Sequence, residues 1–275
     1  MGEFSSSISK RFQHTRIQQG YCLICGEFGK LTQDHVPPQG SITISKVEQR
    51  HLVEVIGQGV SHVRGVVSPN GSKFKTICSH CNSFHLGRND GEVARVNRDF
   101  TQKIQEYFGN INTIYRSVTA DVDAVKYARA MAGHILSATS VEECKRAPEP
   151  SAYYDPIKEF VLGDDQALDH SHDIYYWFYP FSRHFSAKLV TFRNAGHTSV
   201  LSILSFFPIA FMLTKKNKGA FPAHARKLRK THTKLTLDLS SAGIRYSEFP
   251  FGGLKDDQMM ALRDSQAIVS YPIGQ

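Results

Sequence analysis

Four cysteines form two Cys-x-x-Cys pairs in the first third of the chain. The first pair is Cys22 and Cys25, and the second pair is Cys78 and Cys81. Each pair can present two thiolates to one metal ion, and two pairs complete a closed tetrahedral site of the kind that holds structural zinc. Four thiolates leave no open coordination position, so we expect this Zn²⁺ to stabilise the fold without taking part in chemistry.

Three side chains suited to chemistry lie between these pairs or next to them. Asp34 and His35 are adjacent, and Asn82 directly follows the last Cys. Carboxylate and amide oxygens suit a harder cation such as Mg²⁺ or Mn²⁺. Histidine can take a proton from water near neutral pH without a perturbed pKa. The sequence therefore predicts a catalytic set of His35, Asp34 and Asn82, in which Asp34 and Asn82 bind a catalytic divalent ion.

This arrangement resembles the HNH (ββα-metal) endonucleases, in the subgroup whose finger is pinned by four cysteines. In that family a two-stranded hairpin carries an Asp-His pair, and a following helix carries the last ligand. The resemblance implies that His35 is the general base that activates water, with Asp34 as a ligand at the end of the first strand and Asn82 as a ligand from the helix. The motifs that carry it lie within residues 20–95 and are Cys22-x2-Cys25, Asp34-His35 and Cys78-x2-Cys81-Asn82.

The chain departs from the family pattern at one position. The family usually has a further Asn shortly before the second Cys pair, but residues 72–77 read Ser-Lys-Phe-Lys-Thr-Ile. The nearest candidate, Asn70, is out of register, so the middle position of the motif is not identified. The segment Asp34–Pro38, Asp-His-Val-Pro-Pro, is also similar to HNH effectors of bacterial anti-phage systems, which favours DNA as the substrate and a role in defence.

Two alternatives stay open at this stage. One is a non-catalytic zinc ribbon that binds nucleic acid or protein, in which Asp34 and His35 form a turn before the prolines. That alternative leaves Asp34, His35 and Asn82 unexplained as a set. The other is an HNH nuclease of a mobile element or a phage.

The composition is that of a globular protein. The 275 residues are 41% hydrophobic and 21% charged, and the net charge of +8 favours a polyanionic partner such as DNA. Paired Cys-x-x-Cys motifs without a secretory signal indicate metal binding in a reducing cytoplasm. The longest apolar run, Val200–Leu213, contains Pro208 and is too short to span a bilayer, so we expect no membrane association.

We expect an α+β fold. Residues 1–20 would form an N-terminal arm, residues 21–100 an HNH nuclease domain, and residues 101–275 an α+β accessory domain for DNA binding, sensing or oligomerisation, with a second copy or a partner defence protein. The apolar and polar periodicity predicts strands at 31–35, 52–56, 63–67, 74–77, 173–179, 184–193, 198–213 and 234–239. It predicts helices at 121–137, 221–230 and 256–268 and one starting at Asn82, a mixed linker at 97–119, and a loop at 138–156.

A basic segment follows in the second half. Between Ile174 and Leu237 there is no Asp or Glu, but there are eleven Lys or Arg. An acid-free basic segment beside a nuclease module is a candidate phosphate-binding surface, and the alternative is solvated surface with a chance sign bias. The candidate nucleic-acid-binding residues in it are Lys215, Lys216, Lys218, Arg226, Lys227, Arg229 and Lys230, and Lys234 closes the segment.

Further candidates follow Asn82 on the predicted helix. His85 lies three residues on, which places it on the same helical face as an auxiliary ligand, a phosphate contact or a plain surface residue. Arg88 and Arg95 could contact phosphates next to the one that is cut.

Overall fold

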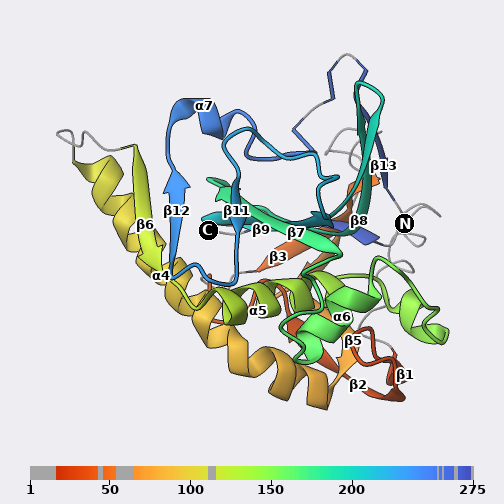
Figure 1. The fold of residues 1–275 in the computed structure, drawn as a ribbon. Coiled ribbons are helices and arrows are strands. Elements are labelled where there is room, and N and C mark those ends of the chain that lie inside the picture. Colours follow the sequence, from red (N-terminus) through yellow and green to blue (C-terminus); the bar gives the residue numbers. More distant parts are fainter. Residues whose placement is uncertain are drawn as a thin grey trace.

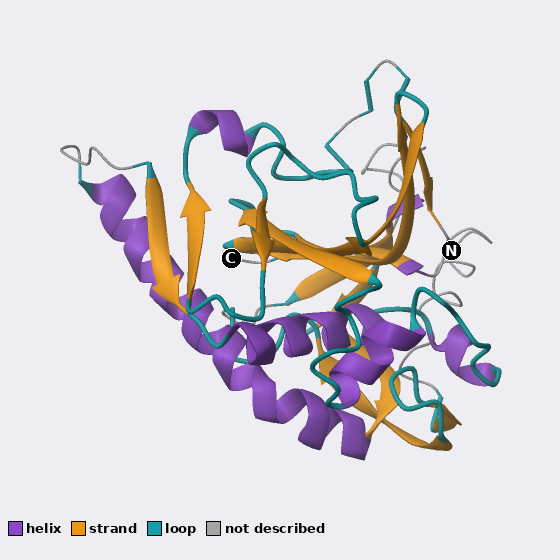
Figure 2. Ribbon diagram, in the orientation of Figure 1, coloured by secondary structure: helices purple, strands orange, loops and turns teal. Residues whose placement is uncertain are grey.

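The structure is a computed structural model that describes residues 17–42, 46–53, 65–110, 116–252, 254–255, 257–262 and 266–273. It combines helices and sheets and has the predicted α+β class. In Figures 1 and 2 the helices labelled α4, α5 and α6 lie below a large sheet, the short helix α7 lies above it, and a small sheet lies at the lower right. No helix in the described ranges is long and apolar enough to cross a membrane.

The small sheet carries the Asp-His pair, and the turn between its first two strands carries the first Cys pair. It has three antiparallel strands in the order β1-β2-β5, which are β1 Gln19–Tyr21, β2 Phe28–His35 and β5 Lys73–Cys78. A π-helical turn, η2 Cys81–Leu86, follows β5 and leads directly into α4 Gly87–Gly109. The two strands predicted at 31–35 and 74–77 and the helical start near Asn82 are thereby confirmed.

The large sheet joins the two halves of the chain. Its order is β11-β7-β10-β9-β8-β14-β3-β4, and β13 also pairs with β8. The insertion after the Asp-His pair supplies β3, which pairs with the last strand, β14. The strands are β3 Val47–His51, β4 Val66–Ser68, β7 His172–Phe178, β8 His184–Asn194, β9 His197–Phe206, β10 Ile209–Lys215, β11 Arg226–Leu228, β13 Met259–Leu262 and β14 Ala267–Pro272.

Both faces of this sheet are buried. Successive residues of β7 alternate between two hydrophobic clusters, with Tyr176 in one and Tyr175 and Trp177 in the other. The first cluster also contains the helices and the small sheet, and the second includes Phe249 and Phe251 from the C-terminal part. Burial on both faces explains why the strands read as nearly continuous apolar and aromatic runs.

Helix α5, Ala124–Ser137, lies between the two sheets. It contacts α4, α6 (Asp155–Leu162) and η2, and it also contacts β5 of the small sheet and β8 and β9 of the large one. A Cβ atom at Gly133 would lie 2.1 Å from Leu86 Cδ2, so a glycine is needed where α5 approaches η2. The remaining elements are the strand pair β6 Ser117–Asp121 and β12 Lys234–Asp238, the short 3₁₀ helix η3 Val141–Lys145, and α7 Ser241–Ile244.

The helix predicted from Asp121 begins three residues later. Asp123 is the N-cap of α5, and its carboxylate accepts a hydrogen bond from the backbone N–H of Lys126 (3.1 Å). Asp121 is the last residue of β6. The apolar periodicity predicts this helix but not its first residue, because Asp121 and Asp123 both suit an N-cap position.

The mixed linker predicted at 97–119 is wrong. Helix α4 continues to Gly109 and buries Val93, Val96, Phe100 and Ile104, which recur at helical spacing on one face. The predicted boundary between residues 100 and 101 falls inside this helix, and the division into two domains stays a prediction.

The two helices predicted near the C-terminus are also wrong. Residues 221–230 contain β11, which pairs with the edge of β7, and residues 256–268 overlap β13 and the start of β14. In β13 the exposed Met259 precedes a half-buried Met260, which is the alternation of a strand. Sheet pairing with distant strands overrides local helix preference here.

The other strand predictions are mostly confirmed. The runs at 173–179, 184–193 and 234–239 correspond to β7, β8 and β12. The run at 198–213 is two strands, β9 and β10, and the loop at 138–156 contains η3. Of the two strands expected in the insertion, the one at 63–67 overlaps β4, whereas the one at 52–56 begins after β3 has ended at His51. Residues 54–64 lie outside the described residues, and so do residues 1–16 of the N-terminal arm.

A buried histidine in β8 predicts acid sensitivity of the fold. His184 is 8% exposed, its Nδ1 has no partner in the described part of the chain, and burial lowers its pKa to about 4. The unfolded chain binds a proton at His184 below about pH 6.5, whereas the folded chain does not until pH 4. We expect this residue alone to lower the free energy of unfolding by about 2 kcal/mol at pH 5 relative to pH 7. Urea unfolding at both pH values should show that the free energy of unfolding of His184→Leu changes less between pH 7 and pH 5 than that of wild type, by this amount. The same change in wild type and variant would contradict the prediction.

Candidate metal centre and the adjoining polar site

The four cysteine thiols meet at one point between β2, β5 and η2. One sulfur atom from each of Cys22, Cys25, Cys78 and Cys81 lies within 4.8 Å of the others. The Sγ atoms of Cys25 and Cys78 are 3.9 Å apart. A tetrahedral ion with Zn–S bonds of about 2.3 Å separates its sulfur ligands by about 3.8 Å, so the residues present fit a metal ion such as zinc. In the part of the chain that the structure describes, this is the only group of three or more His, Cys, Asp or Glu with such spacing.

The protein environment supports ionised sulfur in this cluster. Backbone N–H groups donate to sulfur, from Cys78 to Cys22 Sγ (3.3 Å) and from Cys81 to Cys78 Sγ (3.5 Å). A hydrogen bond with the Cys81 thiol lowers the pKa of Cys22 to about 5, and the same bond raises the pKa of Cys81. Without a cation the four thiols therefore cannot all ionise together, whereas a divalent ion would hold all four as thiolates.

Asp34 does not point into open solvent. It is 3% exposed, and its Oδ2 accepts a hydrogen bond from Ser137 Oγ (2.6 Å) on α5. The Nδ1 atom of His134, also on α5, lies 3.0 Å from the same oxygen. Because both contacts use Oδ2, an ion would have to be bound through Oδ1.

His134 connects two carboxylates inside the protein. Its ring is 0% exposed, and its Nε2 lies 2.9 Å from Oδ1 of Asp90 on α4. Burial lowers the pKa of His134, but the charges of Asp34 and Asp90 outweigh it and raise the pKa to about 10. The imidazolium therefore donates from both nitrogens, fixing Asp34 against α5 and α4. The motifs do not identify His134. The only signal in the sequence is a histidine on the apolar face of a helix, because a polar side chain that is buried there needs hydrogen-bond partners.

Replacing His134 with leucine should destabilise the protein strongly. The variant would leave the Asp34 carboxylate buried without its cationic partner, which costs about 3–5 kcal/mol. Ser137→Ala, which removes only a neutral hydrogen-bond donor to the same oxygen, is the matched control and should cost about 1–2 kcal/mol. Urea unfolding at pH 7 measures the free energy of unfolding of both variants. Equal small losses of this free energy would contradict the role of His134 as the partner of Asp34.

Asn82 is hydrogen-bonded to β2, the strand that carries Asp34. Its Nδ2 donates to the backbone carbonyl of Gln33 (2.9 Å) and lies 3.2 Å from Thr32 Oγ1. The β2–β5 ladder shifts register between Thr32 and Asp34, which makes the carbonyl of the intervening Gln33 available to a side chain. The amide nitrogen of Asn82 is thus bonded at the residue that precedes Asp34, and no hydrogen bond within the described ranges involves its Oδ1.

His35 is half-buried at the end of β2, where it pairs in the ladder with Lys73. Burial lowers the pKa of its imidazole, and the charge of Lys73 lowers the pKa further. The charge of Asp34 and, to a smaller extent, a hydrogen bond with the backbone of Asn70 raise the pKa. His35 is therefore neutral at neutral pH, with a ring held by the backbone of the turn between β4 and β5.

The other candidates on η2 and α4 have aromatic or acidic neighbours. The ring of His85 is in edge contact with those of His80 and Phe84, and the guanidinium of Arg88 lies 3.5 Å from the centroid of the Phe84 ring. Arg95 is paired with Glu92 on its own helix (2.6 Å) and donates to the carbonyl of Asp121. The structure brings His85 and Arg88 together on η2 and α4, while Arg95 ties α4 to β6.

No Asp or Glu occurs within the basic segment, but the fold places acidic residues from earlier in the chain next to its lysines. The ammonium of Lys227 is 2.7 Å from the Asp173 carboxylate, and Lys230 is 2.7 Å from that of Asp169. Lys216 donates to the backbone carbonyl of Asp169, and Lys234 lies 4.0 Å from Asp121. These acidic residues precede the segment in the sequence. Asp173 and Asp121 lie in β7 and β6, which pair with β11 and β12, and Asp169 lies in the turn before β7. Lys215 and Lys218 are exposed near the end of β10.

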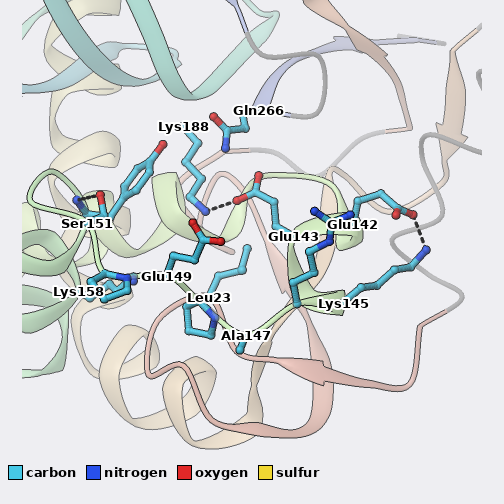
Figure 3. Close-up of a pocket in the computed structure, with 14 residues that line it drawn as sticks. Leu23, Glu142, Glu143, Lys145, Ala147, Glu149, Ser151, Lys158, Lys188 and Gln266 are labelled. Carbon is cyan, nitrogen blue, oxygen red and sulfur yellow. Dashed lines mark hydrogen bonds and ion pairs between the residues drawn. The ribbon is translucent and has the colours of Figure 1, made fainter.

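A cavity of about 640 Å³ opens beside the first Cys pair, between residues 142–151 and Lys188 (Figure 3). Lys188 is buried and donates to the Glu143 carboxylate, and Lys145 is 2.6 Å from Glu142. The lysines and glutamates neutralise one another, so this cavity does not present a positive surface to a polyanion.

A comparison with known proteins gave no match of this chain to a protein-family model, a curated protein or a solved structure. Function has to be inferred from the residues of the chain and their geometry.

Proposed function

We propose that this protein is a metal-dependent endonuclease of the HNH type that hydrolyses DNA phosphodiester bonds. One observation supports this above the others: Asn82, directly after the last cysteine, is bonded to β2 at the residue before the Asp34–His35 pair. Strands β2 and β5 and the helical segment after β5 would then form the ββα-metal finger, with zinc bound by the four cysteines. The segment Asp34–Pro38 further supports a role in anti-phage defence.

The proposed roles follow from the position of each side chain. Asp34 Oδ1 and Asn82 Oδ1 would hold one Mg²⁺ or Mn²⁺ ion. Bound there, the ion would act as a Lewis acid that stabilises charge developing on the phosphate oxygens. His134 and Ser137 hold Asp34 in place through its other oxygen. The cysteine cluster fixes the start of η2 relative to β2, so that His35 and Asn82 come from adjacent elements.

His35 would act as the general base. A neutral imidazole takes the proton from the attacking water as the water oxygen bonds to phosphorus, and the ester P–O bond breaks with the leaving oxygen protonated by solvent. The lowered pKa keeps the imidazole neutral at physiological pH, and the hydrogen bond to the Asn70 backbone orients the ring.

Dependence on a divalent ion tests this proposal. Purified protein would be depleted of loosely bound ions, shown to retain one zinc ion per chain by mass spectrometry, and incubated with supercoiled plasmid with and without Mg²⁺ or Mn²⁺. We expect nicked and linear DNA only with the added ion. DNA binding without cleavage under all these conditions would favour the non-catalytic zinc ribbon instead.

A further inference from the structure

A second feature of the molecule suits phosphate groups. A groove of about 600 Å³ opens to solvent beside β11 and the turn that leads to β12. It is lined by basic, hydroxyl and aromatic side chains and by no carboxylate, namely Tyr176, Arg226, Lys227, Arg229, Thr231, His232, Thr233, Lys234 and Thr236. Figure 1 shows β11 and β12 on the side of α5 away from β2 and β5, so the groove is separate from the cysteine cluster.

The pairing of charges selects two of the Lys and Arg residues that line this groove. Lys216, Lys227 and Lys230 are each engaged by an aspartate side chain or its backbone. Arg226 and Arg229 are exposed, and among the described residues no hydrogen bond or ion pair involves either guanidinium. The arginines therefore carry the uncompensated positive charge of this groove.

The chemistry of the lining favours a phosphodiester chain. A guanidinium presents a planar fork of donors that matches two phosphate oxygens, and threonine hydroxyls add further donors. Tyr176, the one Phe, Tyr or Trp in the lining, is 3% exposed, and its hydroxyl accepts from the backbone N–H of Thr236 (3.2 Å), so it offers no face on which a base could stack. An open groove with phosphate contacts and no base contacts binds a nucleic acid independently of its sequence.

We propose that this groove binds the phosphate backbone of DNA through Arg226 and Arg229, away from the site of hydrolysis. This inference rests on the proposed function in that the DNA bound is the nuclease substrate. The groove would then hold substrate independently of the metal centre, and the paired lysines of the same segment would contribute little.

The test measures binding without cleavage. In a His35→Ala background, fluorescence anisotropy would give the affinity for a labelled 20-base-pair duplex over a range of NaCl concentrations. The variant pair is Arg226→Ala with Arg229→Ala, and the matched control is Lys216→Ala with Lys230→Ala, which removes the same formal charge from the same segment. Melting temperatures would confirm that both are folded.

The arginine variant should bind about tenfold more weakly, and the slope of log affinity against log salt should fall by about 1.8, for two lost phosphate contacts. The lysine control should stay close to the parent. Equal losses in both variants, an unchanged affinity in the arginine variant, or no binding of duplex by the parent would overturn the proposal. Binding of anionic phospholipid vesicles in place of duplex would overturn it too.

The two proposals can fail separately. If cleavage by the wild-type chain requires His35 but the two double variants bind alike, the nuclease assignment stands and the groove is wrong. If the arginines carry duplex binding but no condition gives His35-dependent cleavage, the groove stands and the nuclease assignment is wrong.

Discussion

Replacing His35 with alanine should abolish DNA cleavage and leave the fold and the DNA affinity unchanged. The side chain lies half-buried at the end of β2 and makes its hydrogen bond to the backbone of Asn70, so its removal breaks no ion pair of the core. A positioned general base contributes about 10²–10⁴-fold to a rate, which is enough to bring plasmid cleavage below detection. Single-turnover cleavage of a labelled duplex measures the loss, and circular dichroism and anisotropy measure fold and binding.

His80→Ala is the matched control for this experiment. His80 is exposed in the second Cys pair, next to the same site, and is not assigned a chemical role. It should keep a rate within a few-fold of wild type. Cleavage by His35→Ala at the wild-type rate would remove His35 as the base, and loss of cleavage in both variants would point to a disturbed fold instead.

Replacing Cys78 with serine should lower both stability and zinc content. The four sulfurs join β2, β5 and η2, and the second pair is tied to Cys22 by a backbone N–H of Cys78. Structural zinc contributes on the order of 10 kcal/mol to folding of small zinc domains, so loss of one ligand should cost several kcal/mol here. Thermal unfolding and metal analysis of the purified variant test this, with an expected zinc content well below one ion per chain.

The fifth cysteine supplies the control for that variant. Cys144 is fully buried in η3, outside the cluster, and its thiol makes a long contact to the carbonyl of Thr76 (3.6 Å). Cys144→Ala should retain one zinc ion and lose about 1 kcal/mol or less of stability. Equal melting temperatures and zinc contents of Cys78→Ser and wild type would show that the cluster does not hold a structural ion.

Local patterns in the sequence located the elements that carry the candidate site. The spacing of the cysteines anticipated that they meet, and the alternation before Asp34 and before Cys78 anticipated β2 and β5. The wrong helix predictions lie in segments whose structure is decided by pairing with strands far away in the sequence. The range 256–268 has the composition of a helix, but Met259–Leu262 pairs with β8, and the strand that starts at Ala267 pairs with both β8 and β3. Pairing across more than 200 positions leaves no local signal.

The polar surroundings of the site could be predicted only in part. Asp34 was identified from its motif, whereas its partners His134 and Ser137 come from a helix about 100 residues later. Because no acid occurs within the basic segment, the sequence predicts it as a candidate phosphate-binding surface without separating its members. In the folded chain, Asp169 and Asp173 form ion pairs with lysines of this segment. Arg226 and Arg229 are left as the unpaired cations among the described residues of the groove.

Plasmid cleavage by the wild-type chain beside His35→Ala tests the nuclease assignment most directly. Both proteins would first be shown to hold one zinc ion and to have the same circular dichroism spectrum, and would then be incubated with supercoiled plasmid and Mg²⁺ or Mn²⁺. Conversion to nicked and linear DNA by wild type alone is the predicted result. No conversion by either protein, or equal conversion by both, would contradict the assignment of Asp34, His35 and Asn82 as the site of phosphodiester hydrolysis.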